Sequence, residues 1–186
     1  TVTRAGLVDT NSASLVNAAG LSADTLAELV GIDVDQRGYR LHPCKGDYFS
    51  LAPGAPLRVN QLVYPVHTTA GLGVHATLDL GGRIRFGPDT TYVDSVDYRI
   101  DAEKAGSFAE AIRRYLPGLR TEWLSPDYAG VRPKLAGPGE SFRDFVIAEE
   151  SEAGLPGLVN LIGIESPGLT AAGAIAERVV DLLRDR

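Results

Sequence analysis

The stretch that most constrains the fold lies near the C-terminus, where an apolar run, a short elbow and a helical pattern follow one another directly. The run Leu158–Ile164 is typical of a buried strand. The helical pattern after it places an apolar stripe on one side, formed by Ala172, Ala176, Val179, Val180 and Leu183. Such a strand–helix piece cannot bury its apolar faces alone, so it predicts an α/β arrangement with neighbouring strands.

The elbow between this strand and helix has the composition of a helix start. Ser166 is expected to cap the helix, and Pro167 to take its first position, where a missing N–H costs nothing. Gly168 lets the backbone approach a ligand closely. The N–H groups of the first turn and the helix dipole then favour an anionic group. The alternative is an ordinary strand–helix joint, and this stretch taken alone favours the alternative.

The N-terminal part of the chain carries a similar but weaker pattern. Ser14–Gly20 is predicted to be a short strand that ends in small residues, namely Asn17, Ala18, Ala19 and Gly20. A flat or diphosphate ligand could touch the backbone there, although a tight turn explains the same composition. A helix is predicted next, capped by Ser22 and ended by Gly31.

The middle of the chain is rich in β-type segments. Gly81-Gly82, between two alternating segments, predicts a two-residue hairpin turn. That turn would place Leu78 opposite Arg85 and Thr77 opposite Phe86. Neither face of such a hairpin is cleanly polar, so we expect both faces to be covered.

The remaining segments complete the order of elements. Gly71–Ala76 matches a loose dinucleotide-binding pattern, but it runs into an alternating segment, so we interpret it as part of a strand. Asp101–Gly118 is predicted to be a helix stopped by its proline. Asp127–Leu135 and Phe142–Glu150 are expected to be strands, with Glu149 and Glu150 as solvated strand-end charges.

Composition excludes several classes of protein. The net charge of −6 argues against a nucleic-acid-binding face. Cys44 is the only cysteine, which excludes an internal disulfide, and its spacing from His42 does not recur, so no metal site is predicted. The longest apolar run is far shorter than a membrane helix, so a cytoplasmic protein, at most peripheral to a membrane, is expected. No signal peptide is apparent, and Thr1 is not a natural start, so an upstream segment is expected.

Three stretches together resemble one family. They are VNAAG (Val16–Gly20), GVHATLDLGGRIRFGPD (Gly73–Asp89) and the C-terminal AGVRPKLAGPG…FVIAEE…LVNLIGIESPGLTAA. They are similar to the flavin-dependent oxidoreductases of the D-amino-acid-oxidase and glycerol-3-phosphate-dehydrogenase superfamily, above all to the branch with L-2-hydroxyglutarate dehydrogenases and oxidases. The C-terminal elbow is the most specific part of this resemblance, which covers nearly the whole chain.

The resemblance implies a mixed α+β (α/β) fold, in which an antiparallel substrate domain is flanked by βα pieces of an incomplete FAD-binding, Rossmann-like domain. Residues 1–39 and 155–186 would belong to the FAD-binding domain, and residues 40–154 to the substrate domain. The strand, Gly-rich diphosphate loop and ribose-binding acid that open such enzymes are absent from this sequence. The chain therefore resembles the C-terminal half of a longer enzyme, whose N-terminal FAD-binding half would be its partner.

The resemblance also implies the site residues. FAD would be the cofactor, and the residues near it would be Asn17, Ala18, Ala19, Gly20, Gly163, Ile164, Glu165, Ser166, Pro167, Gly168 and Leu169. Arg132 would bind the carboxylate or phosphate of a small anionic substrate, since a guanidinium binds a carboxylate with two parallel hydrogen bonds. His75 would take the hydroxyl proton of a 2-hydroxy acid as hydride passes to the flavin. Tyr64 and Lys45 would line the pocket.

Alternatives remain for several of these residues. Arg132 and His75 are also compatible with purely structural places on strands. The substrate is predicted to resemble L-2-hydroxyglutarate, while an amino acid or a glycerol phosphate stays open, because an arginine reports only an anionic group. A truncated, non-catalytic binding or interaction module is a second hypothesis. The third is a two-chain enzyme whose other chain supplies the diphosphate loop, in which case an apolar partner surface is expected on residues 1–31 and the last helix.

Overall fold

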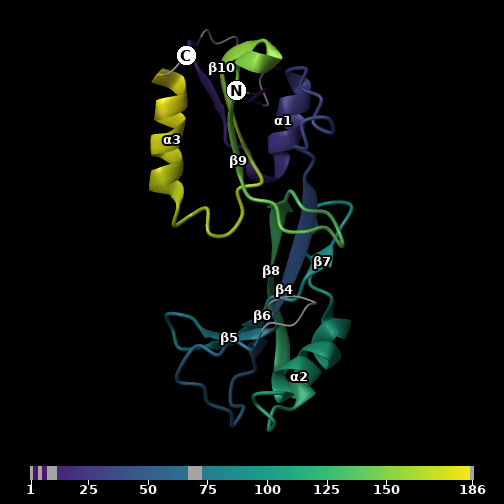
Figure 1. Ribbon diagram of the computed structural model, residues 1–186. Coiled ribbons are helices and arrows are strands. Elements are labelled where there is room, and N and C mark those ends of the chain that lie inside the picture. The colour runs from purple at the N-terminus through teal and green to yellow at the C-terminus, as the bar shows by residue number, and fades with distance from the viewer. Residues whose placement is uncertain (1, 4–5, 8–11, 67–72, 185–186) are drawn as a thin grey trace. The chain divides into compact units, whose positions relative to one another are not determined.

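The computed structural model describes residues 2–3, 6–7, 12–66 and 73–184 (Figure 1). The chain folds as two compact units. One, here called the terminal unit, consists of Thr1–Leu41 and Pro133–Arg186, and the other, the central unit, of His42–Arg132. The first division lies close to the predicted residue 40. The second lies well before the predicted residue 154, because β9 (Val146–Glu150) pairs with a strand of the terminal unit.

The terminal unit is built on a three-stranded sheet in the order β3-β10-β9. β10 (Leu155–Ile162) runs parallel to β3 (Leu15–Asn17) and antiparallel to β9. α1 (Ala23–Leu29) and α3 (Ala172–Arg184) lie on opposite sides of this sheet (Figure 1). A short antiparallel pair, β1 (Val2–Thr3) and β2 (Gly6–Leu7), precedes it.

The two faces of β10 pack against different helices because side chains alternate along a strand. Leu158 and Ile162 are buried against Ala23 and Ala27 of α1. Leu161, on the other face, lies next to α3. The nearly unbroken apolar character of the run therefore reflects a strand covered on both faces.

A buried polar network crosses this unit and corrects one expectation. Glu150 is not a solvated strand-end charge, since only 1% of its surface is exposed. The Tyr39 hydroxyl and the Asn160 amide donate to Oε1 of Glu150, both at 2.9 Å. Arg37 lies 3.2 Å from its Oε2. Burial, followed by the hydrogen bond to Glu150, raises the pKa of Tyr39 to about 12, which keeps this hydroxyl a donor at neutral pH.

The central unit is a mostly antiparallel sheet with strand order β5-β6-β4-β7, and β8 pairs with β4 as well. Its strands are listed here in chain order: β4 (His42–Leu51), β5 (His75–Leu78), β6 (Ile84–Gly87), β7 (Thr91–Tyr92) and β8 (Leu124–Lys134). A single α-helix, α2 (Ala105–Arg113), packs on the sheet among the described residues. The antiparallel sheet between two βα pieces confirms the predicted fold class.

The β5–β6 hairpin is confirmed, but its predicted register is wrong by one residue. Ala76 pairs with Phe86 and Thr77 with Arg85. The turn is longer than two residues because the Asp79 carboxylate accepts hydrogen bonds from the backbone N–H groups of Gly81 and Arg83. This shift separates apolar from polar side chains, since a one-residue slip moves every side chain to the other face.

The apolar face of the sheet forms the core of the central unit. Phe49 pairs with Phe86 in register, and the Phe49 ring lies 4.7 Å from the ring of Phe108 on α2. All three side chains are at most 2% exposed. Asp101 caps the turn before α2 by accepting from the Glu103 backbone N–H, so the helix begins in a defined place.

We expect Glu150→Ala to destabilise the protein by about 3 kcal/mol, because it leaves the Tyr39 hydroxyl, the Asn160 amide and the Arg37 guanidinium without their buried acceptor. Chemical denaturation measures the change. Glu152→Ala is the matched control, since that side chain is 90% exposed. Equal stability of the two variants would contradict the structural role of the network.

Candidate functional sites

Two of the predicted cofactor segments meet at one edge of the terminal unit. β3 and β10 are parallel neighbours, with Asn17 directly opposite Asn160. Their carboxyl ends therefore point to the same edge of the sheet. Asn17–Gly20 and Gly163–Leu169 follow these two ends, so the structure brings them together. The edge beyond the carboxyl ends of parallel strands is where α/β sheets bind ligands.

Asn17 shapes this edge with its side chain. Its Nδ2 donates to the carbonyl of Ala23 at 2.7 Å and to Oδ1 of Asn160 at 2.8 Å. Its Oδ1 accepts from the Ala19 backbone N–H at 3.3 Å. Both amide hydrogens of Asn17 are thus used inside the protein, and the side chain is 6% exposed. What this segment offers a ligand is the backbone and the small side chains of Ala18, Ala19 and Gly20.

The elbow departs from the predicted helix start. α3 begins at Ala172, so Ser166 is not the helix cap and Pro167 is not its first residue. Two turns come first, closed by hydrogen bonds from the Gly168 N–H to the Glu165 carbonyl and from the Ala171 N–H to the Pro167 carbonyl. These turns use N–H groups that a helix would have directed at a ligand.

Glycine is required at the start of the elbow. Gly163 has a φ of +72°, and a Cβ there would lie 2.6 Å from the Leu135 side chain. Gly168 is equally enclosed, since a Cβ would lie 2.5 Å from Cγ2 of Ile164. By contrast, Ser166, Pro167 and Leu169 are exposed. The elbow is therefore a tightly held loop with an accessible outer side.

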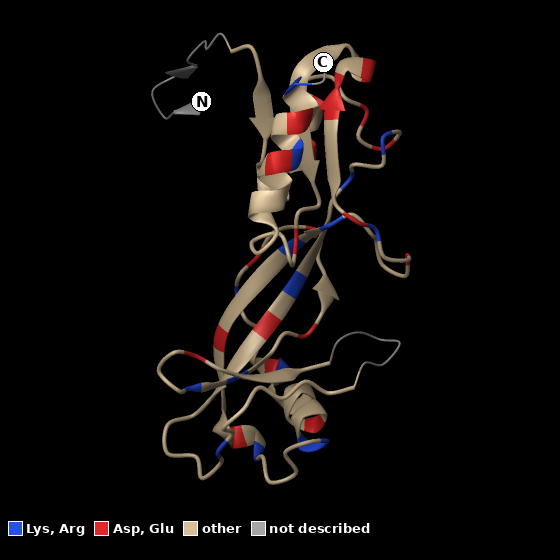
Figure 2. Ribbon diagram, turned by 60° about the vertical axis from the view of Figure 1, so that its left-hand side comes forward, with Lys and Arg blue, Asp and Glu red and all other residues tan. Residues whose placement is uncertain are grey.

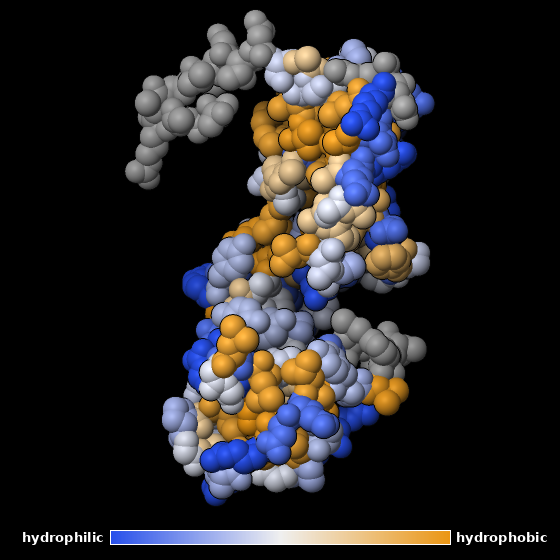
Figure 3. Space-filling model, turned by 90° about the vertical axis from the view of Figure 1, so that its left-hand side faces the viewer, coloured by the Kyte–Doolittle hydropathy of each residue, from blue (hydrophilic) through white to orange (hydrophobic). Residues whose placement is uncertain are grey.

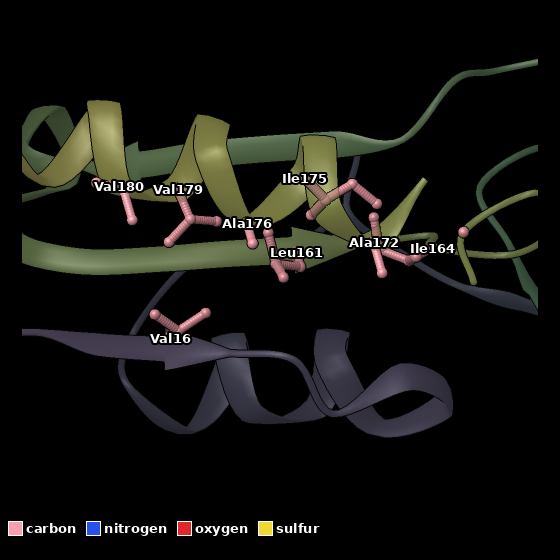
Figure 4. Close-up of a pocket in the computed structure, with 9 residues that line it drawn as sticks. Val16, Leu161, Ile164, Ala172, Ile175, Ala176, Val179 and Val180 are labelled. Carbon is pink, nitrogen blue, oxygen red and sulfur yellow. The ribbon is translucent and has the colours of Figure 1, made fainter. Parts of the chain in front are cut away.

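An apolar groove lies between α3 and the sheet of the terminal unit (Figure 4). Its lining comes from both elements and includes Val16, Leu161, Ile175, Ala176, Val179 and Val180. Val16 and Val180 are 41% and 44% exposed, and Leu15 on β3 is 58% exposed. Figure 3 shows apolar side chains gathered on the surface of this unit. The structure thus has exposed apolar surface on the last helix and on β3, where the two-chain hypothesis expected it.

In the central unit, the polar face of the sheet carries His75. His75 pairs with Gly87, and the Tyr48 ring fills the space that a Cβ on Gly87 would need. The Tyr64 ring stands edge-on to His75, with centroids 4.4 Å apart. Tyr48, Gly87, His75 and Tyr64 therefore form one row across the face opposite Phe49 and Phe86.

Tyr48 connects this row to β8, the strand that also carries Arg132. Its ring stacks on that of Tyr128, with centroids 4.3 Å apart and an interplanar angle of 10°. Burial, followed by the proximity of Tyr128 and a hydrogen bond with it, raises the pKa of Tyr48 to about 12, while the Arg132 guanidinium acts to lower it. The Tyr48 hydroxyl is thus protonated at neutral pH and lies within the field of a cation. The two tyrosines and Arg132 together suit an anionic ligand.

Lys45 is separated from these residues. It lies on the opposite face of β4 from Tyr48, is 8% exposed, and donates to the Arg99 carbonyl. Its Nζ is 3.3 Å from the buried Asp47, whose other oxygen is 2.7 Å from Lys104. Figure 2 shows acidic and basic positions along the long strands of the central unit. Lys45 belongs to an internal ion network because the alternation of side chains along β4 places it on the face opposite Tyr48.

Tyr48 and Tyr128 were not singled out from the sequence. Tyr48 stands three residues after Lys45 in the same strand, so residue type alone did not distinguish them. The register of Phe49 against Phe86 distinguishes Tyr48 from Lys45, because it assigns the odd-numbered side chains of β4 to the core.

Two features are absent from the part of the chain that the structure describes. Among the residues that the structure describes, no group of three histidine, cysteine or acidic side chains could hold a metal ion. Within the same residues, every helix is too short or too polar to cross a membrane.

Comparison with known proteins defines the class. Residues 1–182 match the family described as DAO, FAD dependent oxidoreductase, so the chain belongs to the FAD-dependent oxidoreductases of the D-amino-acid-oxidase family. FAD is accordingly the cofactor of its family, as predicted.

Individual proteins of this family show which enzymes the chain resembles. The chain is 43% identical over 182 residues to L-2-hydroxyglutarate dehydrogenase, mitochondrial, of Arabidopsis thaliana, covering 90% of this chain and 37% of that protein. It is 29% identical to glycerol 3-phosphate dehydrogenase of Caloramator mitchellensis, covering 92% and 34%. The structure of L-alpha-glycerophosphate oxidase from Mycoplasma pneumoniae with FAD bound is similar with a TM-score of 0.71 at 28% identity, covering 92% of this chain and 42% of that one. The chain thus spans well under half the length of these relatives.

One edge of the terminal unit has the features that such a cofactor requires. A flat, polar ring system and a diphosphate need exposed backbone groups and small side chains at the strand ends. Ala18 is exposed, and the space that a Cβ on Gly20 would occupy is open. The elbow presents its backbone next to these residues at the same sheet edge. These features are found in the two segments that were predicted to belong to an FAD-binding domain.

We expect Gly163→Ala to destabilise the protein by roughly 2 kcal/mol, because alanine resists a positive φ and would collide with Leu135. Gly173→Ala is the matched control on α3, where a Cβ meets nothing within 4 Å. That control should stabilise by about 0.5–1 kcal/mol. Thermal unfolding of both variants measures the contrast, and a neutral Gly163→Ala would show that the elbow is looser than described.

Proposed function

We propose that this chain is the C-terminal portion of an FAD-dependent enzyme that oxidises a small 2-hydroxy acid, with L-2-hydroxyglutarate as the leading substrate. The observation that carries the proposal is the polar face of the central sheet, where His75, Tyr48 and the group around Arg132 lie opposite the packed core. The 43% identity to an L-2-hydroxyglutarate dehydrogenase supports the substrate class. Bound FAD would accept the hydride from the substrate.

The residues of the central unit would have separate roles in substrate binding and proton transfer. Arg132 would hold a substrate carboxylate through two parallel hydrogen bonds. Tyr48, protonated and beside Arg132, would keep that cation and Tyr128 in place. His75 would accept the proton of the substrate hydroxyl, and the edge-on ring of Tyr64 would fix the imidazole plane.

The terminal unit would hold the cofactor. Asn17–Gly20 and Gly163–Leu169 would contact FAD through backbone and small side chains at the shared strand edge. The elbow would lie against the pyrimidine side of the isoalloxazine. The apolar groove along α3 would take the remaining part of the FAD-binding domain, whether this part belongs to the same polypeptide or to a second chain.

The substrate assignment is tested by anaerobic reduction of flavin in the full-length protein. L-2-Hydroxyglutarate should bleach the flavin absorbance much faster than glycerol 3-phosphate does. Arg132→Met should raise the substrate concentration for half-maximal reduction by about 10–100-fold, since it removes a charged hydrogen-bond pair. Arg114→Met, at an exposed position of the central unit, should leave it unchanged.

Other outcomes of this experiment are informative. Faster reduction by glycerol 3-phosphate would replace the proposed substrate class. A full-length protein that binds L-2-hydroxyglutarate without flavin reduction would favour the non-catalytic binding module.

The role of His75 is tested by the pH dependence of flavin reduction. A histidine base must be neutral to accept the proton, so the wild-type rate should fall towards acid pH. His75→Gln should lower the maximal rate by about 10²–10⁴-fold and abolish this acid limb. His42→Gln on β4 is the control and should keep both rate and limb. An unchanged pH profile in His75→Gln would assign the base to another group.

A further inference from the structure

The elbow is held from one side by the segment that follows Pro133. Lys134 Nζ lies 3.2 Å from Oε1 of Glu165, and the Glu165 side chain is only 9% exposed. The next residue, Leu135, is buried and fills the space that Gly163 leaves open by lacking a Cβ. Two successive side chains therefore contact two elbow residues, one by charge and one by shape.

This segment is itself anchored. Arg143 donates through Nη1 to the Leu135 carbonyl at 3.1 Å and through Nη2 to the Gly38 carbonyl at 2.6 Å. Leu135 also belongs to the core around α1. Lys134 thus projects from an anchored backbone, and its side chain, 25% exposed, is held by the ion pair with Glu165.

The ion pair between Lys134 and Glu165 is important because the elbow would lie against the flavin. A nearly buried carboxylate requires a partner charge or hydrogen bonds. Reduced flavin is more negative than oxidised flavin, and an uncompensated carboxylate close to it would oppose reduction. The ion pair with Lys134 supplies a compensating charge to Glu165 and so reduces that penalty.

We infer that Lys134 is a positioning residue for the redox chemistry: by neutralising Glu165 it fixes the elbow and keeps the reduction potential of the flavin high enough to accept hydride from the substrate. This inference rests on the proposed function, in which the elbow lies against the flavin. Neither residue needs to touch the substrate for this role.

The test is the flavin midpoint potential of the full-length holoprotein, measured by equilibration with a reference dye. Lys134→Met should lower the potential, with about tenfold less reduced flavin at a fixed dye potential, or ~30 mV for a two-electron couple. Glu165→Gln should shift the potential in the opposite direction. The double variant should return towards wild type, and Lys134→Arg should retain the wild-type value.

The controls separate charge from stability. Arg178→Met removes one positive charge from an exposed position of α3 and should leave the potential unchanged. A Lys134→Met protein with a lower melting temperature but a wild-type potential would overturn the inference, since a purely structural brace behaves in that way. A wild-type protein that binds no FAD would overturn the proposed function and the inference together.

Discussion

The pairing of β3 with β10 is the constraint on which the terminal unit depends. Asn17 and Asn160 lie 143 positions apart, and a 2.8 Å hydrogen bond joins their side chains. The same Asn160 donates to the buried Glu150, which in turn binds Tyr39 and Arg37. One continuous network thus fixes two parallel strand ends, and the segments predicted to contact the cofactor follow those ends.

In the central unit, the two faces of the sheet have different roles. Phe49, Phe86 and Phe108 form a dry core on one face, which leaves the other face for a row of aromatic and basic side chains. A rigid sheet suits such a row because neighbouring strands hold side chains at defined spacing. Lys45 and Lys104 both pair with the buried Asp47, so the core-side face of the strand that carries Tyr48 holds charged as well as apolar side chains.

Much of the organisation was predictable from local patterns. The strand–elbow–helix order, the hairpin around Gly81-Gly82 and the helix before Pro117 all appear in the structure. The hairpin register was not predictable, because the Asp79 carboxylate lengthens the turn through contacts that a two-glycine signal does not encode. The first residue of α3 was predicted wrongly for a similar reason. The turns at Glu165–Ala171 use N–H groups that would otherwise lie free in the first turn of a helix.

The sequence by itself determined the classes of element, the small residues at the strand ends and the basic and imidazole side chains available for chemistry. Tertiary structure decided which of them share a face. Lys45 and Tyr48 stand three residues apart, yet strand alternation buries one in an ion network and stacks the other on Tyr128. Glu150 resembles a surface charge in sequence, and its long-range partners Arg37 and Tyr39 explain its burial. Such partners are distant in sequence, so no local pattern reports them.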